Sequence, residues 1–248
     1  MNSKIKTGVV LFGILEESSN NYRKLSKKSL GVLLVKEGDK YNLPEYECLQ
    51  SLNLDDQSIL ALKDKTGLED VYVEQLYTFS KVKEGNLFIN PTFLGLISKE
   101  QMYDGLKENC YWCELKIEEK EDRYECDIFN EIDEFKFVIS RKLKEHTTDR
   151  YKFNDMELGL LKEEVGVILV SAFERLRTKG NYTDIVFNMM GETFTLKELQ
   201  QVYETIENKP LLDAAFRRII ADKVEETEEM LKGIGCRPSK IYRYKEKK

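Results

Sequence analysis

The sequence predicts an α+β fold with two domains joined by a long helix, because the spacing of its apolar residues changes along the chain. The first half contains short apolar runs, such as residues 8–15 and 30–35, bounded by polar segments as buried strands are. Beyond residue 154 the apolar residues recur every three or four positions, which is the period of a helix. A chain of 248 residues is long enough for two compact domains. We therefore expect domains at residues 1–153 and 181–248, linked by a helix at 154–180.

One helix is expected inside the first domain, at residues 56–66. Its apolar side chains cluster, and Gly67 follows where a helix stop is needed. Strand patterns follow this helix, and the last two flank a polar turn and predict a hairpin. These strands are expected at residues 72–79, 92–97, 124–129 and 134–139.

The linking helix is expected from Asn154 to Lys179, a length of about 25 residues by the helical period. Asn154 and Glu157 resemble a capping box, and Gly180 is placed to end the helix. The apolar stripe is wider than one sheet face would cover, so a domain-linking or dimer-forming helix is expected, with an ordinary core helix as the alternative. The stripe consists of Leu158, Leu161, Val165, Ile168, Ala172 and Leu176, widened by Leu160, Leu169 and Phe173.

The last domain is expected to begin near Tyr182 with two helices. Thr195 and Glu198 form a capping box that opens the first helix, which Pro210 ends. Asp213 is expected to cap the second helix. Three apolar residues of that helix are expected to face inward, namely Phe216, Ile220 and Val224.

Arg217 and Arg218 are then expected near the start of the second helix, where a recognition helix meets a DNA groove. A turn at Gly233 and Gly235 and a strand over residues 239–245 complete the order helix, turn, helix, hairpin. This order is that of a winged helix-turn-helix domain.

Charge is unevenly distributed. The net charge of −6 excludes a chain that binds nucleic acid over its whole surface, but residues 237–248 hold six lysines and arginines and one glutamate. A solvated basic tail is the alternative reading of this end. The residues expected to contact DNA are Thr195, Arg217, Arg218, Arg237, Lys240 and Arg243.

Several function classes find little support in the sequence. The Cys110-x-x-Cys113 pair lies in a strand pattern without a completing zinc motif, and His146 is the only histidine, in a polar run. A histidine-dependent nucleophilic mechanism is therefore not expected. No apolar run is long enough to span a membrane, and the N-terminus lacks a signal-peptide cleavage site. With five cysteines and no export signal, we expect reduced thiols and a cytoplasmic protein.

The order of the C-terminal segments resembles the NrtR family of Nudix-related transcriptional regulators. The segments that carry the resemblance are AFERLRTKGNYTDIVFNMM, FTLKELQQVYE, LLDAAFRR and RPSKIYRY. In the first half, KTGLEDVYVEQLYTF is similar to the stretch that follows the Nudix helix. The resemblance implies a Nudix-like α/β/α sandwich with a mixed sheet, followed by a winged helix-turn-helix domain. The family's recognition segment usually has asparagine and lysine where this chain has Ala215 and Ile219, which implies a different operator sequence.

The Nudix box of this chain is degenerate. An active box, G-x5-E-x7-R-E-U-x-E-E-x-G-U with U apolar, holds divalent metal through its glutamates. Anchored on Gly67, the box positions over residues 46–68 fall on Tyr46, Leu52, Leu60, Ala61, Asp64, Lys65 and Gly67. A lysine stands where a metal ligand belongs, and one aspartate survives. Asp55 and Asp56 are the only substitutes, and they are expected before the helix.

The resemblance thus implies a transcriptional regulator without catalytic residues, metal or cofactor. Its partners would be a double-stranded DNA operator, a small nucleotide or sugar effector such as an ADP-ribose-like metabolite, and a second copy of the chain. One alternative is a Nudix hydrolase of ADP-ribose-type substrates, which would need Mg²⁺. Another is a non-enzymatic interaction protein, whose partner surface would be the acid-rich segment CELKIEEKEDRYECD.

Overall fold

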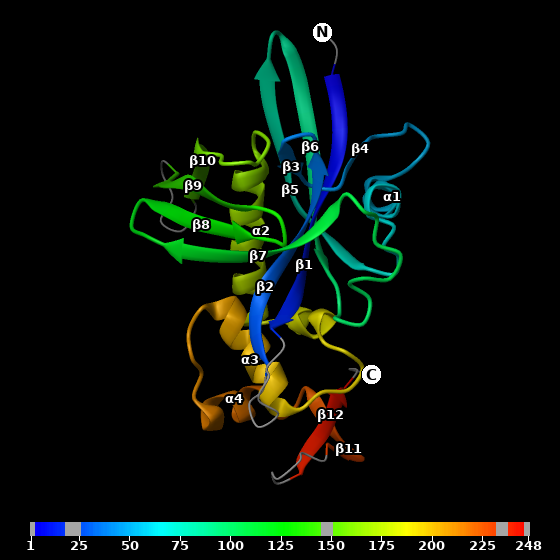
Figure 1. Ribbon diagram of the computed structural model, residues 1–248, viewed down its shortest axis with the longest axis vertical. Coiled ribbons are helices and arrows are strands. Elements are labelled where there is room, and N and C mark those ends of the chain that lie inside the picture. The colour runs from blue at the N-terminus through cyan, green and yellow to red at the C-terminus, as the bar shows by residue number, and fades with distance from the viewer. Residues whose placement is uncertain (1–2, 18–25, 145–150, 232–237, 246–248) are drawn as a thin grey trace.

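The computed structural model describes residues 3–17, 26–144, 151–231 and 238–245. A large domain built on one sheet lies above a smaller helical domain, and the C-terminal hairpin lies beside the smaller domain (Figure 1).

The large domain is built on a mixed sheet in the order β10-β9-β8-β7-β2-β1-β6-β5, to which β3 and β4 add at β2 and β1. The pair β1–β6 is parallel and the other neighbours are antiparallel, which confirms the mixed sheet. The strands are β1 (Ser3–Glu17), β2 (Lys27–Glu37), β3 (Lys40–Asn42), β4 (Glu45–Glu47), β5 (Tyr72–Lys83), β6 (Asn86–Leu96), β7 (Cys110–Glu119), β8 (Arg123–Phe129), β9 (Glu134–Leu143) and β10 (Tyr151–Glu157).

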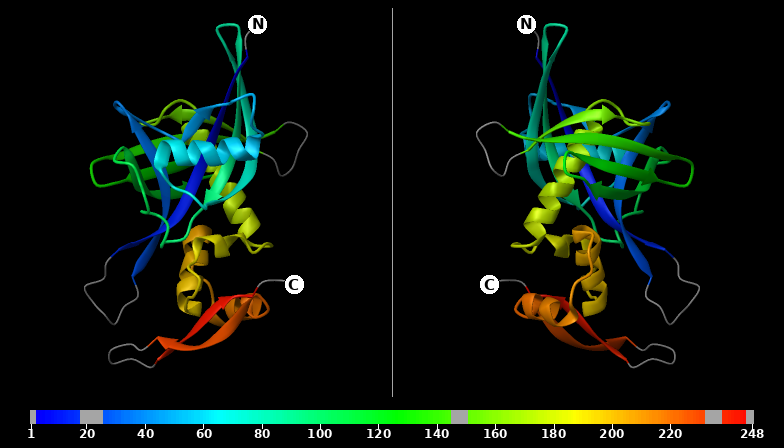
Figure 2. Two further views of the ribbon diagram at one scale, coloured as in Figure 1. Left: turned by 90° about the vertical axis from the view of Figure 1, so that its right-hand side faces the viewer. Right: turned by 90° about the vertical axis from the view of Figure 1, so that its left-hand side faces the viewer.

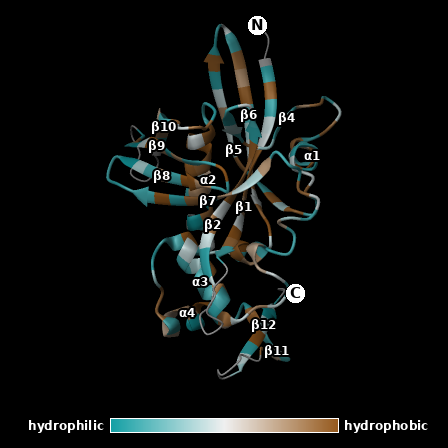
Figure 3. Cartoon of the chain, viewed as in Figure 1, coloured by the Kyte–Doolittle hydropathy of each residue, from teal (hydrophilic) through white to brown (hydrophobic). Residues whose placement is uncertain are grey.

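One helix covers each face of this sheet, as Figure 2 shows from two sides. Helix α1 (Leu54–Thr66) packs through Leu62 against Val9 and Leu11 of β1. The opposite face of β1, with Val10 and Phe12, belongs to the core that includes α2 (Val165–Gly180). Alternation along a strand explains how β1 serves both cores. Figure 3 shows apolar residues concentrated on the central strands and on α2.

The predicted helix from Asn154 to Lys179 is wrong in its first part. Residues 151–157 form strand β10, which pairs with β9, and the helix begins only at Val165. Between them, Gly159 and Glu164 have positive φ angles of 52° and 72°, which an α-helix cannot contain. The apolar residues of the turn between β10 and α2 have a helical spacing because they also face the core. The long-range pairing of β10 with β9 overrides that local pattern.

The capping box predicted at Asn154 and Glu157 is wrong for the same reason. Asp155 of β10 caps α2 instead, because its Oδ2 accepts a hydrogen bond from the Glu164 amide at 2.9 Å. Burial raises the pKa of Asp155, although the backbone amides of the helix N-terminus oppose this. The helix ends at the predicted Gly180.

The small domain contains η1 (Ile185–Met189), α3 (Leu196–Glu207), α4 (Asp213–Ile220) and a hairpin of β11 (Val224–Leu231) and β12 (Ser239–Tyr244). Helix α2 contacts η1 and α3 as well as the sheet. Its residues Leu169, Ala172 and Leu176 are fully buried within this chain. The helix therefore links the two domains, and these residues of its apolar stripe form part of the core.

The two domains meet where α3 lies against β2. The side chains of Gln201 and Thr205 donate hydrogen bonds to the carbonyls of Ser26, at 3.3 Å, and Lys28, at 3.5 Å. Beside this contact, Glu16 of β1 pairs with Lys28 and with Lys99. The Lys28 side chain is only 7% exposed, so this charge depends on its partner.

Candidate functional site

Thr195 opens α3 as predicted. Its Oγ1 accepts a hydrogen bond from the Glu198 amide at 3.2 Å, and Glu198 accepts one from the Thr195 amide at 2.8 Å. The two bonds satisfy backbone donors that a helix start leaves free. Thr195 is 6% exposed, so the structure gives it a role in holding the helix. Its contact with DNA stays a prediction.

Helix α4 is held by residues of α3 rather than by a cap of its own. The predicted cap at Asp213 is wrong, because Leu212 is the N-cap and makes no side-chain hydrogen bond, while Asp213 is the first helical residue. Gln200 of α3, itself buried, donates from Nε2 to the Leu211 carbonyl and to Asp213 Oδ1, both at 2.9 Å. This buried amide fixes the turn between the helices, and sequence reasoning missed it because glutamine gives no local signal for such a bond.

The inner face of α4 is apolar as predicted. Phe216 and Ile220 are buried, and the Phe216 ring meets the Tyr203 ring of α3 at 5.5 Å between centroids. Val224 was expected to continue this face, but it begins strand β11 instead. The helix ends at Ile220, after eight residues, and gives way to the hairpin.

The outer face of α4 carries the two predicted arginines. Both Arg217 and Arg218 are exposed, and they lie in the last turn of the helix rather than near its start. Neither side chain forms an ion pair with any residue that the structure describes. Ile219 beside them is 57% exposed. Free guanidinium groups on an exposed helix are suited to contacts with phosphates and guanine edges.

The hairpin carries two of the other predicted basic residues, and both are paired. Lys240 Nζ lies 2.8 Å from Glu226 Oε2, and Arg243 Nε lies 2.5 Å from Glu225 Oε1. The hydrogen bond to Glu226 raises the pKa of Lys240. The strand predicted over residues 239–245 is confirmed. Arg237 and the predicted turn at Gly233 and Gly235 lie outside the described residues.

Helix α1 keeps the shape of a Nudix helix without its acids. Asn53 caps its start, and Gly67 ends it with a left-handed φ of 85°. Gly67 is required there because a Cβ would also lie 2.2 Å from the Gly105 carbonyl oxygen. At the degenerate positions, Ala61 is fully buried and Leu52 lies at the surface, while Leu60 is partly buried. The helix serves packing at these positions.

The remaining charges of the box neutralise one another. Lys65 Nζ lies 3.6 Å from Asp64 Oδ2 and 5.7 Å from the centroid of the Tyr46 ring. Asp55 and Asp56 lie in the first turn of α1, not before the helix as expected. Within the described ranges, the structure contains no group of three or more His, Cys, Asp or Glu side chains that could hold a metal ion. The residues present therefore do not fit the magnesium site of an active box.

A cavity of about 450 Å³ lies on the face of the sheet that α2 covers, opposite α1. It lies between the start of α2, the β5–β6 hairpin and residues 42–45, which precede the degenerate box. Three of its lysines pair with glutamates of its own walls, as Lys6 does with Glu45 at 3.3 Å, whereas Lys162 pairs with Glu37 outside the cavity. The charged residues that line it are Lys4, Lys6, Glu45, Lys81, Lys83, Glu84, Lys162, Glu163 and Glu164. The lysines thus outnumber the glutamates of the lining by one.

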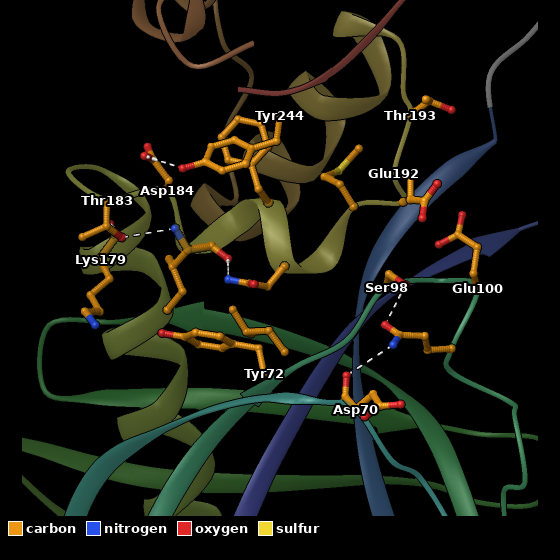
Figure 4. Close-up of a pocket in the computed structure, with 17 residues that line it drawn as sticks. Asp70, Tyr72, Ser98, Glu100, Lys179, Thr183, Asp184, Glu192, Thr193 and Tyr244 are labelled. Carbon is orange, nitrogen blue, oxygen red and sulfur yellow. Dashed lines mark hydrogen bonds between the residues drawn. The ribbon is translucent and has the colours of Figure 1, made fainter. Parts of the chain in front are cut away.

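A larger cavity of about 990 Å³ lies at the domain junction. Figure 4 shows Tyr72 of β5 and Tyr244 of β12 on opposite sides of it. Tyr244 donates a hydrogen bond to Asp184 Oδ2 at 3.1 Å, and Lys223 pairs with Asp184 Oδ1 at 2.9 Å. The walls of this cavity thus join the winged domain to the end of α2.

The two cysteines of the C-x-x-C sequence face opposite cores. Cys110 packs in the cluster beneath α1, and Cys113 packs in the cluster beneath α2. Burial raises the pKa of Cys110, and it raises that of Cys113 to about 11. Two buried thiols on opposite faces of one strand cannot bind a common metal ion. His146 lies outside the described residues. Among those residues, no helix is long and apolar enough to cross a membrane.

Comparison with known proteins identifies the small domain. Residues 186–244 match the model of the NrtR DNA-binding winged helix domain. Over these residues the C-terminal domain is similar to the winged helix domain of the NrtR family. The resemblance predicted from the sequence is confirmed, and this NrtR winged helix domain spans η1 to β12.

Relatives and solved structures extend the match. A protein of Acinetobacter baylyi (strain ATCC 33305 / BD413 / ADP1), the ADPR responsive transcriptional repressor NtrR, is 42% identical over 79 residues, which are 31% of each chain. The match thus spans about a third of that relative's length. The fold is also that of a MutT/nudix family protein from Enterococcus faecalis, with a TM-score of 0.70, 19% identity and coverage of 99% and 87%. Shewanella oneidensis NrtR complexed with a 27mer DNA has a TM-score of 0.64 and 20% identity, with coverage of 97% and 93%. A Nudix fold followed by an NrtR winged helix domain is therefore the architecture of this chain.

Proposed function

We propose that this chain is a DNA-binding transcriptional regulator of the cytoplasm, whose Nudix-like domain binds a nucleotide effector without hydrolysing it. The observation that carries the proposal is the contrast between the two helices. In the NrtR winged helix domain, Arg217 and Arg218 are exposed and without ion pairs among the described residues. In the Nudix-like domain, Ala61 and Lys65 occupy positions where an active box has metal-binding glutamates.

Helix α4 would enter the major groove of an operator. The major groove is about 12 Å wide, which admits an α-helix of about 10–12 Å in diameter. Arginine reads guanine through two parallel hydrogen bonds and also binds phosphates. Lys240 and Arg243 of the hairpin, with Arg237, are further candidates for phosphate contact. A homodimer would present two such helices to half-sites about 34 Å apart.

The effector would bind in the cavity beside residues 42–45. A Nudix enzyme neutralises the pyrophosphate of its substrate with metal ions. Here five lysines line the cavity, and a phosphate group could replace the wall glutamates as partner of Lys6, Lys81 or Lys83 without metal. The Acinetobacter relative is named as ADPR responsive, so ADP-ribose is the first ligand to test.

The test is a gel-shift titration of the DNA upstream of the chain's own gene, with and without ADP-ribose and with EDTA throughout. We expect sequence-selective binding that weakens as salt rises, and a shift of the midpoint by ADP-ribose in the absence of metal. A parallel incubation with ADP-ribose and Mg²⁺ should leave the nucleotide intact. Turnover that Asp64→Ala abolishes would instead establish the hydrolase, and the absence of selective DNA binding under every condition would refute the regulator.

A further inference from the structure

The hairpin of the winged domain is acidic on one strand and basic on the other. Strand β11 carries four glutamates, and β12 with Lys245 carries three basic residues. The wing of a DNA-binding domain ordinarily lies against phosphates, where four carboxylates are repelled. The sequence contains the run Glu225-Glu226-Thr227-Glu228-Glu229, but its position opposite the basic residues becomes visible only in the paired hairpin.

Two of the four glutamates are directed at the basic residues. Glu225 is the register partner of Arg243, so the two side chains share one face of the ribbon, and their ion pair measures 2.5 Å. Glu226 reaches Lys240 at 2.8 Å across a bulge between Glu226 and Met230. Among the described residues, Glu228 and Glu229 form no ion pair.

The two basic residues lie on opposite faces of the ribbon. Lys240 and Arg243 are three residues apart on β12, and successive side chains of a strand alternate between faces. A ribbon that enters a groove meets one sugar-phosphate backbone with each face, so both cations are placed to bind phosphate once they are released. Each phosphate contact must then replace an existing ion pair.

We infer that Glu225 and Glu226 restrain DNA binding by the wing, so that α4 carries the attachment to DNA and sequence-independent binding stays weak. The inference rests on the proposed function, because it assumes that the winged domain binds DNA. Lys240 and Arg243, which the sequence predicts as DNA contacts, would then contribute less than Arg217 and Arg218. Glu225 and Glu226 would then determine specificity without contacting a base.

The experiment measures binding of the full-length chain to an unrelated duplex and to its own upstream DNA, by fluorescence anisotropy over a range of salt concentrations. For the variant E225Q/E226Q we expect affinity for the unrelated duplex to rise about tenfold or more at low salt. The slope of log K against log salt should steepen by about 1.8, since each added phosphate contact contributes about 0.9. In the wild-type background K240Q/R243Q should weaken binding less than threefold, whereas in the E225Q/E226Q background it should reverse the whole gain.

The matched control is E228Q/E229Q, which removes the same number of charges from the same strand without releasing a cation. It should leave the slope within about half a unit of the wild-type slope, because the number of phosphate contacts is unchanged. Thermal unfolding checks that each variant is folded, and exposed ion pairs of this kind contribute little to stability.

Equal effects of E225Q/E226Q and E228Q/E229Q would overturn the inference. An unchanged slope of log K against log salt in E225Q/E226Q would also overturn it. The proposed function has a separate failure signature. If the wild-type chain and R217Q/R218Q bind the upstream DNA equally poorly, the regulator itself is refuted. If the wild type binds selectively and only the slope prediction fails, the restraint by the wing is refuted alone.

Discussion

Helices α1 and α4 each contain positions that the sequence singled out as functional, yet these positions have opposite surroundings. At the degenerate positions of α1 the charged residues have become apolar or paired, and Ala61 is fully buried. On α4 the inner residues Phe216 and Ile220 are buried, while Arg217 and Arg218 are exposed and unpaired among described residues. Packing therefore explains Ala61 of α1, whereas packing leaves the arginines of α4 unexplained.

The largest expected effect comes from returning a carboxylate to α1. Ala61→Glu places an ionisable side chain at a site with no exposed surface, so we expect a loss of about 3 kcal/mol or more in the free energy of unfolding. Chemical denaturation measures this loss. Hydrolysis of ADP-ribose should stay absent in the variant, since the other metal positions hold Leu52 and Lys65. A folded Ala61→Glu chain that hydrolyses ADP-ribose would contradict this account of α1.

A smaller effect is expected at the domain junction. Burial raises the pKa of Glu16, but its hydrogen bonds and charge interactions with Lys28 and Lys99 more than offset this and leave the pKa below its ordinary value of 4.5. A carboxyl whose pKa is lowered by folding stabilises the protein above the unfolded pKa, and this contribution is lost as pH falls through the folded pKa.

Glu16→Gln should therefore cost about 1–2 kcal/mol at pH 7, as for hydrogen bonds to charged groups. The difference from wild type should shrink as the pH falls below about 4.5, the ordinary pKa of the group. Unfolding followed at several pH values measures both. A difference that stays constant with pH would mean that the carboxylate charge does not support the junction.

The smallest effect concerns the start of α3. Thr195→Ala removes the capping hydroxyl and should destabilise the chain by about 1 kcal/mol. Thr195→Ser, which keeps the hydroxyl, is the matched control and should lose only about a few tenths of a kcal/mol in the free energy of unfolding. Because Thr195 is buried, DNA affinity should fall only as far as the helix frays. A hundredfold loss of affinity in a fully folded Thr195→Ala chain would show direct contact instead.

Local signals explain which parts of the fold were predictable. The stop at Gly67, the capping box at Thr195 and the strands on either side of α1 depend on a few neighbouring residues, and the structure confirms them. The start of α2 was mispredicted because Asp155, ten residues before Val165, caps the helix from a neighbouring strand. No local pattern encodes such a cap.

The same limit applies to the candidate sites. The sequence identified Arg217 and Arg218, and it showed that the Nudix box lacks its acids. It did not show that Gln200 fixes the turn before α4, or that Glu225 and Glu226 face the basic residues of the wing. These contacts depend on how separate elements meet. The role of a charged run such as residues 225–229 can be assigned only once its partner strand is known.

The most direct test of the account compares DNA binding by three forms of the full-length chain, using anisotropy on the upstream duplex and on a scrambled duplex of the same composition. The wild type should prefer the upstream duplex by about a thousandfold or more. R217Q/R218Q should lose about 2–6 kcal/mol of binding free energy, from about 1–3 kcal/mol per arginine contact, with its stability within about 0.5 kcal/mol of wild type. The control K120Q/R123Q neutralises two cations at the β7–β8 turn, which pair with Glu118 and Glu125, and should bind as the wild type does. Equal affinity of the wild type for both duplexes, or equal losses in the two variants, would contradict the claim that α4 reads DNA.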